Sequence, residues 1–147
     1  MAVKEFREVV IEASPSEILD VVADVATMPE WSTIHQSAEV LERDAKGRPL
    51  RARMKIKTTG VTDEIVLAYT WSDDGVTWTQ ESGKVSRNQK GAYTLTPEAD
   101  NTRTKFDLEL DPLVPMPGFV MKRAIKGIME LNTDGLRKRV LKVKKGQ

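Results

Sequence analysis

Polar and hydrophobic residues alternate along most of the first three quarters of the chain, and this period of two is typical of half-buried β-strands. In the clearest example, from Leu50 to Lys57, four apolar residues alternate with four basic ones. Asp73-Asp74-Gly75 is a strong hairpin signal, and Gly91 inside a strand indicates either a bulge or a close backbone approach. The pattern predicts seven strands at residues 3–12, 38–41, 50–57, 65–71, 76–78, 85–95 and 103–111.

Two short helices are predicted after the first strand. Ser14-Pro15-Ser16-Glu17 is typical of a capping box with proline at the first helical position, and the apolar residues between 18 and 25 predict a buried face. Thr27-Met28-Pro29-Glu30 repeats the box pattern and predicts a second short helix that carries Trp31. A residue before proline avoids the helical region, so Met28 is expected to separate the two helices.

One long amphipathic helix is predicted from about residue 119 to residue 143, after Pro115-Met116-Pro117-Gly118. Its apolar stripe contains Met121, Ile125, Ile128, Leu136 and Val140. Its interior also holds four poor helix formers, which indicate a thin face or a kink: Gly127, Asn132, Thr133 and Gly135. For the first of these glycines, a close approach to the sheet is an equally good explanation.

The order of these elements limits the ways in which their apolar faces can be buried. A sheet made of successive hairpins, followed by one closing helix, must curl around that helix to cover it. Such an arrangement tends to leave a cavity between the helix and the sheet. We therefore expect an α+β fold in which a seven-stranded antiparallel sheet surrounds the C-terminal helix.

The length and composition agree with one globular domain over residues 1–147. The chain has 31% charged and 39% hydrophobic residues, and no apolar run long enough to span a membrane. It begins without the apolar region of a signal peptide. The absence of cysteine excludes disulfides and thiolate sites, and it agrees with a reducing compartment. We expect a cytoplasmic protein.

Charge is unevenly distributed, although the net charge is only +1. From residue 119 to the end the chain carries a net charge of +7, and the remainder carries −6. Cations near a helix C-terminus are ordinary, because they meet the negative end of the helix dipole. The alternative is a weak contact with an anionic surface or a protein partner through this basic helix. The basic residues at 51–57 lack interleaved aromatics, so no specific nucleic-acid partner is expected.

No convincing catalytic or metal-binding motif is present. The chain has one histidine, His35, and lacks the glycine-rich motifs that cradle phosphates and the nucleophile elbow of hydrolases. His35 has no recognisable nucleophile motif to act on. Asp73-Asp74 belongs to a turn, and Asp63-Glu64 is expected to be solvated at the start of a strand. We predict no catalytic residue, no metal and no cofactor.

The aromatic residues are the best candidates for a binding site. Trp31 is expected at the cavity mouth, and Tyr69 and Tyr93 are expected to place polar tips in an otherwise apolar pocket. Plain core packing with a satisfied hydroxyl is the alternative for any one of them. The predicted ligand-binding residues are Trp31, Met54, Ile56, Leu67, Tyr69, Trp78, Tyr93, Phe106, Leu108, Met121, Ala124, Ile125 and Ile128.

Several stretches resemble the polyketide cyclase/dehydrase and lipid-transport family of the START-like, Bet v 1-like (SRPBCC) superfamily. They are Ile11-Glu12-Ala13-Ser14-Pro15, Ile18 with residues 20–24, Met28-Pro29-Glu30-Trp31 and the Pro-rich start of the long helix. The resemblance covers nearly the whole chain. It implies a helix-grip fold with two short helices after the first strand, and a cavity for lipids, quinones, polyketides or other apolar molecules.

These observations favour a non-catalytic carrier for a hydrophobic small molecule. The alternative is a polyketide cyclase or dehydratase that uses the same cavity, with Tyr69 or Tyr93 transferring a proton. No obvious acid or base is expected on the inner face, which counts against the enzyme. A third interpretation is an interaction module that acts through the basic helix.

Overall fold

The computed structural model describes residues 3–58, 60–113 and 116–146. Seven strands form one antiparallel sheet in the order β1-β7-β6-β5-β4-β3-β2. They are β1 (Val3–Ile11), β2 (His35–Arg43), β3 (Pro49–Thr58), β4 (Val61–Ser72), β5 (Gly75–Ser82), β6 (Ser86–Glu98) and β7 (Asn101–Pro112). The sheet prediction is therefore confirmed, and β1 is an edge strand that pairs with β7.

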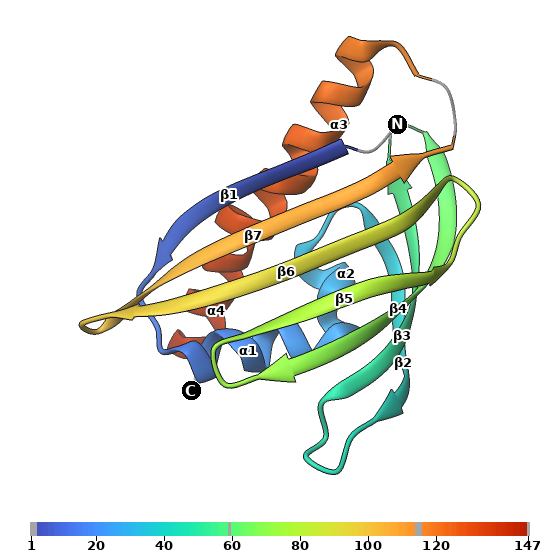
Figure 1. The fold of residues 1–147 in the computed structure, drawn as a ribbon. Coiled ribbons are helices and arrows are strands. Elements are labelled where there is room, and N and C mark those ends of the chain that lie inside the picture. Colours follow the sequence, from blue (N-terminus) through green and yellow to red (C-terminus); the bar gives the residue numbers. More distant parts are fainter. Residues whose placement is uncertain (1–2, 59, 114–115, 147) are drawn as a thin grey trace.

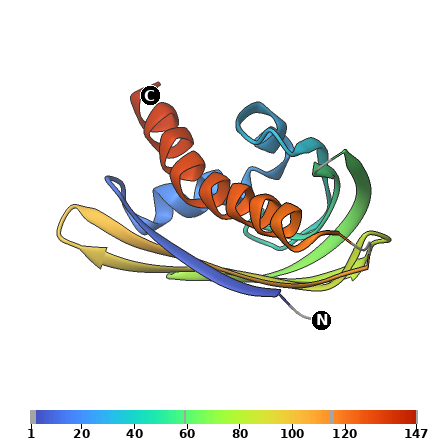
Figure 2. The same cartoon turned by 90° about the horizontal axis from the view of Figure 1, so that it is seen from above.

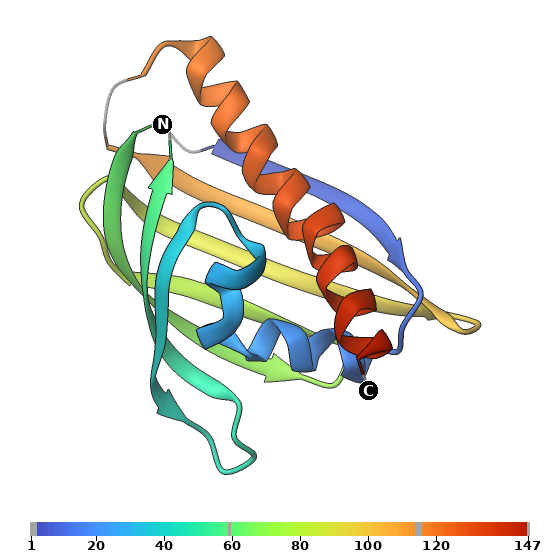
Figure 3. The same cartoon turned by 180° about the vertical axis from the view of Figure 1, so that it is seen from behind.

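The helices lie on one side of the sheet. They are α1 (Pro15–Ala23), the 3₁₀ turn η1 (Val25–Thr27), α2 (Met28–Trp31), α3 (Gly118–Glu130), the π-helical segment η2 (Leu131–Gly135) and α4 (Leu136–Lys145). Figures 1 and 2 show α3, η2 and α4 as one continuous rod across the concave face of the curled sheet. Figure 3 shows α1 and α2 beside this rod, on the same face. This arrangement is the helix-grip fold.

The capping box at the start of α1 is confirmed. The Glu17 amide donates to Ser14 Oγ at 3.2 Å, and the Ser14 amide donates to Glu17 Oε1 at 2.9 Å. The second box is wrong, because Thr27 caps nothing with its side chain and its hydroxyl donates instead to the Asp24 carbonyl. Met28 is itself helical, and the chain leaves the helical region at Asp24, where ψ is 64°. Proline only disfavours a helical residue before it, and packing overrides that preference here.

The predicted long helix extends over its full length but changes its winding in the middle. Three of the four poor helix formers, Asn132, Thr133 and Gly135, lie in the π-helical segment. Thr133 Oγ1 donates to the Met129 carbonyl at 2.8 Å, and Asn132 Nδ2 donates to the Ile128 carbonyl at 2.9 Å. These side chains compete for carbonyls of the preceding turn, which favours the wider winding. Pro115 of the predicted helix start lies outside the described residues.

Gly127 fits neither interpretation offered for it. It is exposed on α3, and a Cβ added there would meet nothing within 4 Å. Gly91 in β6 does mark a close approach, because a Cβ there would collide with the Trp78 indole. The bulge in this strand lies instead between Arg87 and Lys90.

The interior has a packed end and a hollow end. At the packed end α1 and α4 meet the sheet, and Ile11, Ile18, Leu136 and Val140 are at most 1% exposed. At the hollow end α3 and strands β3 to β7 border a cavity. The π-helical segment separates the two ends, because Asn132 borders the cavity and Leu136 does not.

Candidate ligand-binding site

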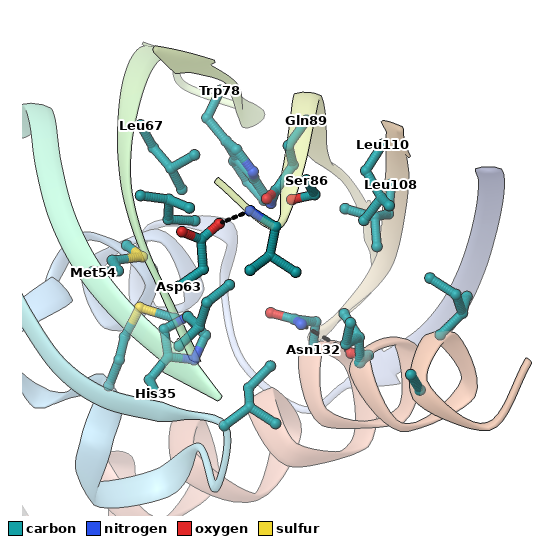
Figure 4. A pocket seen from close by; sticks show the side chains of 18 of the residues that line it. His35, Met54, Asp63, Leu67, Trp78, Ser86, Gln89, Leu108, Leu110 and Asn132 are labelled. Carbon is teal, nitrogen blue, oxygen red and sulfur yellow. Dashed lines mark hydrogen bonds between the residues drawn. The ribbon is translucent and has the colours of Figure 1, made fainter. Parts of the chain in front are cut away.

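An apolar cavity of about 140 Å³ lies between α3 and the inner face of the sheet. Figure 4 shows side chains from the sheet, from the segment after α2 and from the C-terminal helix converging on it. Its wall is mostly aliphatic and aromatic, with a few polar groups. Small-molecule sites commonly have this composition, because apolar walls supply affinity and isolated polar groups fix orientation.

All thirteen residues predicted from the sequence line this cavity. Trp31 comes from α2, and the other twelve come from two opposing surfaces. The sheet contributes Met54, Ile56, Leu67, Tyr69, Trp78, Tyr93, Phe106 and Leu108, and α3 contributes Met121, Ala124, Ile125 and Ile128. Their positions follow from strand alternation, but their contact with a ligand stays a prediction.

Apart from the two tyrosine hydroxyls, sequence reasoning missed the polar part of the wall. His35, Asp63, Ser86, Gln89 and Asn132 line the cavity, together with further apolar residues. The missed apolar set is Val22, Met28, Ile34, Val61, Ile65, Val85, Leu110, Pro112 and Met116. Alternation would have found Asp63, because it shares the parity of Ile65 on β4. The other polar positions depend on a bulge, on a loop and on the π-helical segment.

Asp63 corrects two predictions, since it is buried rather than solvated and places an acid on the inner face. Its side chain is 6% exposed. The carboxylate accepts hydrogen bonds from the backbone amides of Glu64, Lys84 and Val85 at 2.9 to 3.1 Å. These bonds satisfy its oxygens and fix the loop between β5 and β6 at the edge of the cavity. Asp63 therefore has a structural role in holding this loop.

His35 also lies on the cavity wall, at the start of β2. Its Nδ1 is 2.6 Å from Ser32 Oγ, which is itself buried. Burial lowers the pKa of His35 to about 4. The imidazole is therefore neutral near pH 7 and contributes hydrogen-bonding capacity but no positive charge.

The aromatic residues form a cluster along the sheet in which most ring pairs are tilted. The Trp78 ring lies 5.6 Å from Tyr93 and 6.0 Å from both Tyr69 and Phe106, measured between ring centroids. The Tyr93 hydroxyl donates to the Asn132 carbonyl at 2.9 Å and thereby ties β6 to the π-helical segment. Burial raises the pKa values of Tyr69 and Tyr93, so both hydroxyls stay protonated at neutral pH.

A family model described as "Polyketide cyclase / dehydrase and lipid transport" matches residues 5–141. The chain belongs to this family. Among curated proteins no sequence matches significantly. The sequence resemblance is thereby confirmed, and the family assignment covers the strands, the cavity wall and most of the C-terminal helix.

Solved structures with the same fold share little sequence with this family member. A START superfamily protein from Mycobacterium smegmatis is 22% identical, with a TM-score of 0.84 over 95% of this chain and 98% of that one. The ZhuI aromatase/cyclase from Streptomyces sp. R1128 is 11% identical, with a TM-score of 0.80 over 95% and 94%. Ginseng major latex-like protein 151 from Panax ginseng is 8% identical, with a TM-score of 0.67 over 95% and 98%. At these identities the likeness shows the fold alone.

The family and the fold fit a protein that binds a hydrophobic ligand. In the described part of the chain, no group of three or more His, Cys, Asp or Glu residues is placed to hold a metal ion. None of the helices between residues 3 and 146 that the structure describes is long and apolar enough to cross a membrane. The site offers apolar surface, uncharged hydrogen-bonding groups and the hydrogen-bonded carboxylate of Asp63.

The basic C-terminal helix is partly neutralised by acids of the same chain. Arg137 Nε donates to Glu12 Oε1 at 2.9 Å, and Arg139 pairs with Glu30 at 3.2 Å. Lys144 lies 3.7 Å from Glu17. These pairs hold α4 against the N-terminal elements, so a contact with an anionic partner, which stays a prediction, would rely on the other cations.

Proposed function

We propose that this protein binds and carries a hydrophobic small molecule in the cavity beneath α3. The observation that carries the proposal is the apolar wall, to which the sheet and α3 contribute opposing surfaces. Ligand binding there would remove apolar surface from water, at about 25 cal/mol per Å² before ordering costs are subtracted. Tyr69, His35 and Asn132 would contribute orientation.

The size of the cavity limits what fits without rearrangement. Cavities of about 150 Å³ accept a benzene-sized ring, and this cavity measures about 140 Å³. A single ring or one end of a longer molecule therefore fits as the structure stands. A larger ligand would require α3 to move away from the sheet or would extend beyond the cavity mouth.

Native mass spectrometry of the purified protein, followed by solvent extraction, tests the proposal. We expect an adduct whose mass matches an extracted lipid, quinone or polyketide-like molecule. Protein that stays empty, and that also takes up none of a panel of apolar ring compounds, would contradict a carrier function.

The second candidate is a cyclase or dehydratase reaction in the same cavity. Besides Asp63, which holds the loop between β5 and β6, three ionisable groups on the cavity wall favour it, namely His35, Tyr69 and Tyr93. Burial, however, moves their pKa values away from neutrality, whereas general acid–base catalysis works best with groups that titrate near the working pH. We therefore prefer the carrier. Turnover of a polyketide-like substrate that is lost in His35→Gln, with binding retained, would reverse this preference.

A further inference from the structure

The described residues of the cavity wall include no lysine or arginine. The acidic side chain among them is Asp63, and His35 is neutral near pH 7. Figure 4 shows the Asp63 carboxylate on the same side of the cavity as His35. An anionic ligand group would therefore find no opposite charge on this wall and would be repelled by the carboxylate.

The Asp63 carboxylate is fixed in position and cannot rotate out of the cavity wall. Its two oxygens accept four hydrogen bonds from three backbone amides, which hold the carboxylate in place. Burying an unpaired carboxylate of a ligand nearby would strongly weaken binding, because the ionic group would lose its hydration without compensation. The wall consequently disfavours carboxylates, sulfonates and phosphates.

The uncharged polar groups add a second constraint, because several donors lack an acceptor. Nε1 of Trp31 and Nε1 of Trp78 are buried without a hydrogen-bond partner. The Tyr69 hydroxyl also has no hydrogen bond to any residue that the structure describes, but it is not fully buried as the two indole N–H groups are. Tyr93 differs, since its hydroxyl already donates to Asn132. Unsatisfied buried donors are rare in folded proteins and indicate a missing acceptor.

Resting on the proposed function, we propose that the ligand is an uncharged molecule with a carbonyl-type acceptor on an apolar ring. The Tyr69 hydroxyl and the indole N–H groups would supply donors to the carbonyl oxygen. The cavity would reject the carboxylate analogue of the same ring. Gln89 and Ser86 also border the cavity and supply both donors and acceptors, so they do not remove the excess of donors.

Three compounds that share one ring system test the hydrogen bond and the charge separately: indane, 1-indanone and indane-1-carboxylate. Titration of ¹⁵N-labelled protein, followed by NMR, gives an affinity for each. We expect the ketone to bind about ten-fold more tightly than the hydrocarbon, which is the worth of one hydrogen bond. We expect the carboxylate to bind at least a hundred-fold more weakly than the ketone, on the order of the cost of an unpaired buried charge. The ketone should also shift the indole N–H resonance of Trp31 or Trp78 more than indane does.

A lysine placed on the wall should weaken or reverse the preference for the ketone over the carboxylate. Gln89 is half-buried at the cavity, and Gln89→Lys adds a cation there with little change in length (Figure 4). It should raise the affinity for the carboxylate relative to the ketone by about ten-fold or more. Thr94→Lys is the matched control, because Thr94 is exposed on the outer face of the same strand. Tyr69→Phe should lower the ratio of ketone affinity to hydrocarbon affinity.

The outcomes separate this inference from the proposed function. If none of the three compounds binds, this inference is overturned, and the carrier function is overturned with it if the purified protein is also empty. If indane binds and the carboxylate matches or exceeds the ketone, the carrier function stands and the charge selectivity is wrong. If indane and indanone bind equally and Tyr69→Phe leaves their ratio unchanged, the requirement for an acceptor is wrong.

Discussion

At the scale of single residues, two glycines show how the same methyl group can have opposite effects. At Gly91 an added Cβ would meet the Trp78 indole, while at Gly127 it would meet open space. We expect Gly91→Ala to lower the free energy of unfolding by about 1–3 kcal/mol, the usual range for overpacking. Gly127→Ala should raise it by up to about 1 kcal/mol, because alanine favours the helix. Urea denaturation measures both, and equal losses in the two variants would contradict the assigned environments.

His35 should make folding stability depend on pH. Its pKa is about 4 in the folded protein, below the ordinary value of 6.5. Between these values the unfolded chain binds a proton that the folded chain does not, so stability falls as the pH decreases from 6.5 to 4. The loss is on the order of 3 kcal/mol.

The variant His35→Gln provides the control for this pH dependence, because it keeps every other ionisable group of the protein. Chemical denaturation at pH 7, 5.5 and 4 should give the wild type the steeper loss of stability. Parallel losses in the wild type and the variant would show that His35 has the same pKa in the folded and the unfolded chain.

At the scale of elements, the loop between β5 and β6 depends on one side chain from β4. The Asp63 carboxylate holds the amides of Lys84 and Val85. Asp63→Asn removes the charge and half of the acceptor capacity, so it should cost about 1–3 kcal/mol. The exchange of these two amide hydrogens should accelerate in the variant.

The neighbouring substitution Glu64→Gln is the matched control for Asp63. Glu64 is exposed on the opposite face of β4, where it lies 3.2 Å from Arg53. A surface pair of this kind contributes little, so the stability should change by less than about 1 kcal/mol. Unaltered exchange at Lys84 and Val85 in Asp63→Asn would mean that the loop is held by other contacts.

The C-terminal helix shows a second dependence between elements. Its π-helical segment turns Asn132 toward the cavity. There the Asn132 carbonyl accepts a hydrogen bond from the hydroxyl of Tyr93 on β6. The residues beyond it, Leu136 and Val140, face the packed end of the core. One change of winding therefore places a polar group at the boundary between the hollow end and the packed end.

At the scale of the whole molecule, a ligand that binds only the folded state should stabilise the fold by mass action. At one hundred times its Kd, an apolar ring compound should add about 2.7 kcal/mol, and Tm should rise by several degrees. Leu108→Trp should remove this shift, because the indole would occupy the cavity beside Trp78. The variant should remain folded, at a cost of about 1–3 kcal/mol for overpacking. An unchanged ligand-induced rise in Tm would refute the assignment of this face to the site.

Much of the wall of the site was predictable from local patterns. Strand alternation decides which residues share a face, so Met54, Leu67 and Phe106 were expected on the inner face and lie there. The capping box at Ser14 was predictable for the same reason, since its hydrogen bonds join residues three apart. These features need no knowledge of the rest of the chain.

The sequence by itself determined the strands, most helix boundaries and the apolar faces, because each depends on neighbouring residues. Only the tertiary structure decided which polar groups line the cavity and how they are bonded. The Asp63 carboxylate finds its partners 21 and 22 residues away, and the Tyr93 hydroxyl finds Asn132 39 residues away. The low pKa of His35 comes from burial by elements distant in the chain. Such contacts exist only after the sheet has closed around the helix, and they set the charge and polarity of the site.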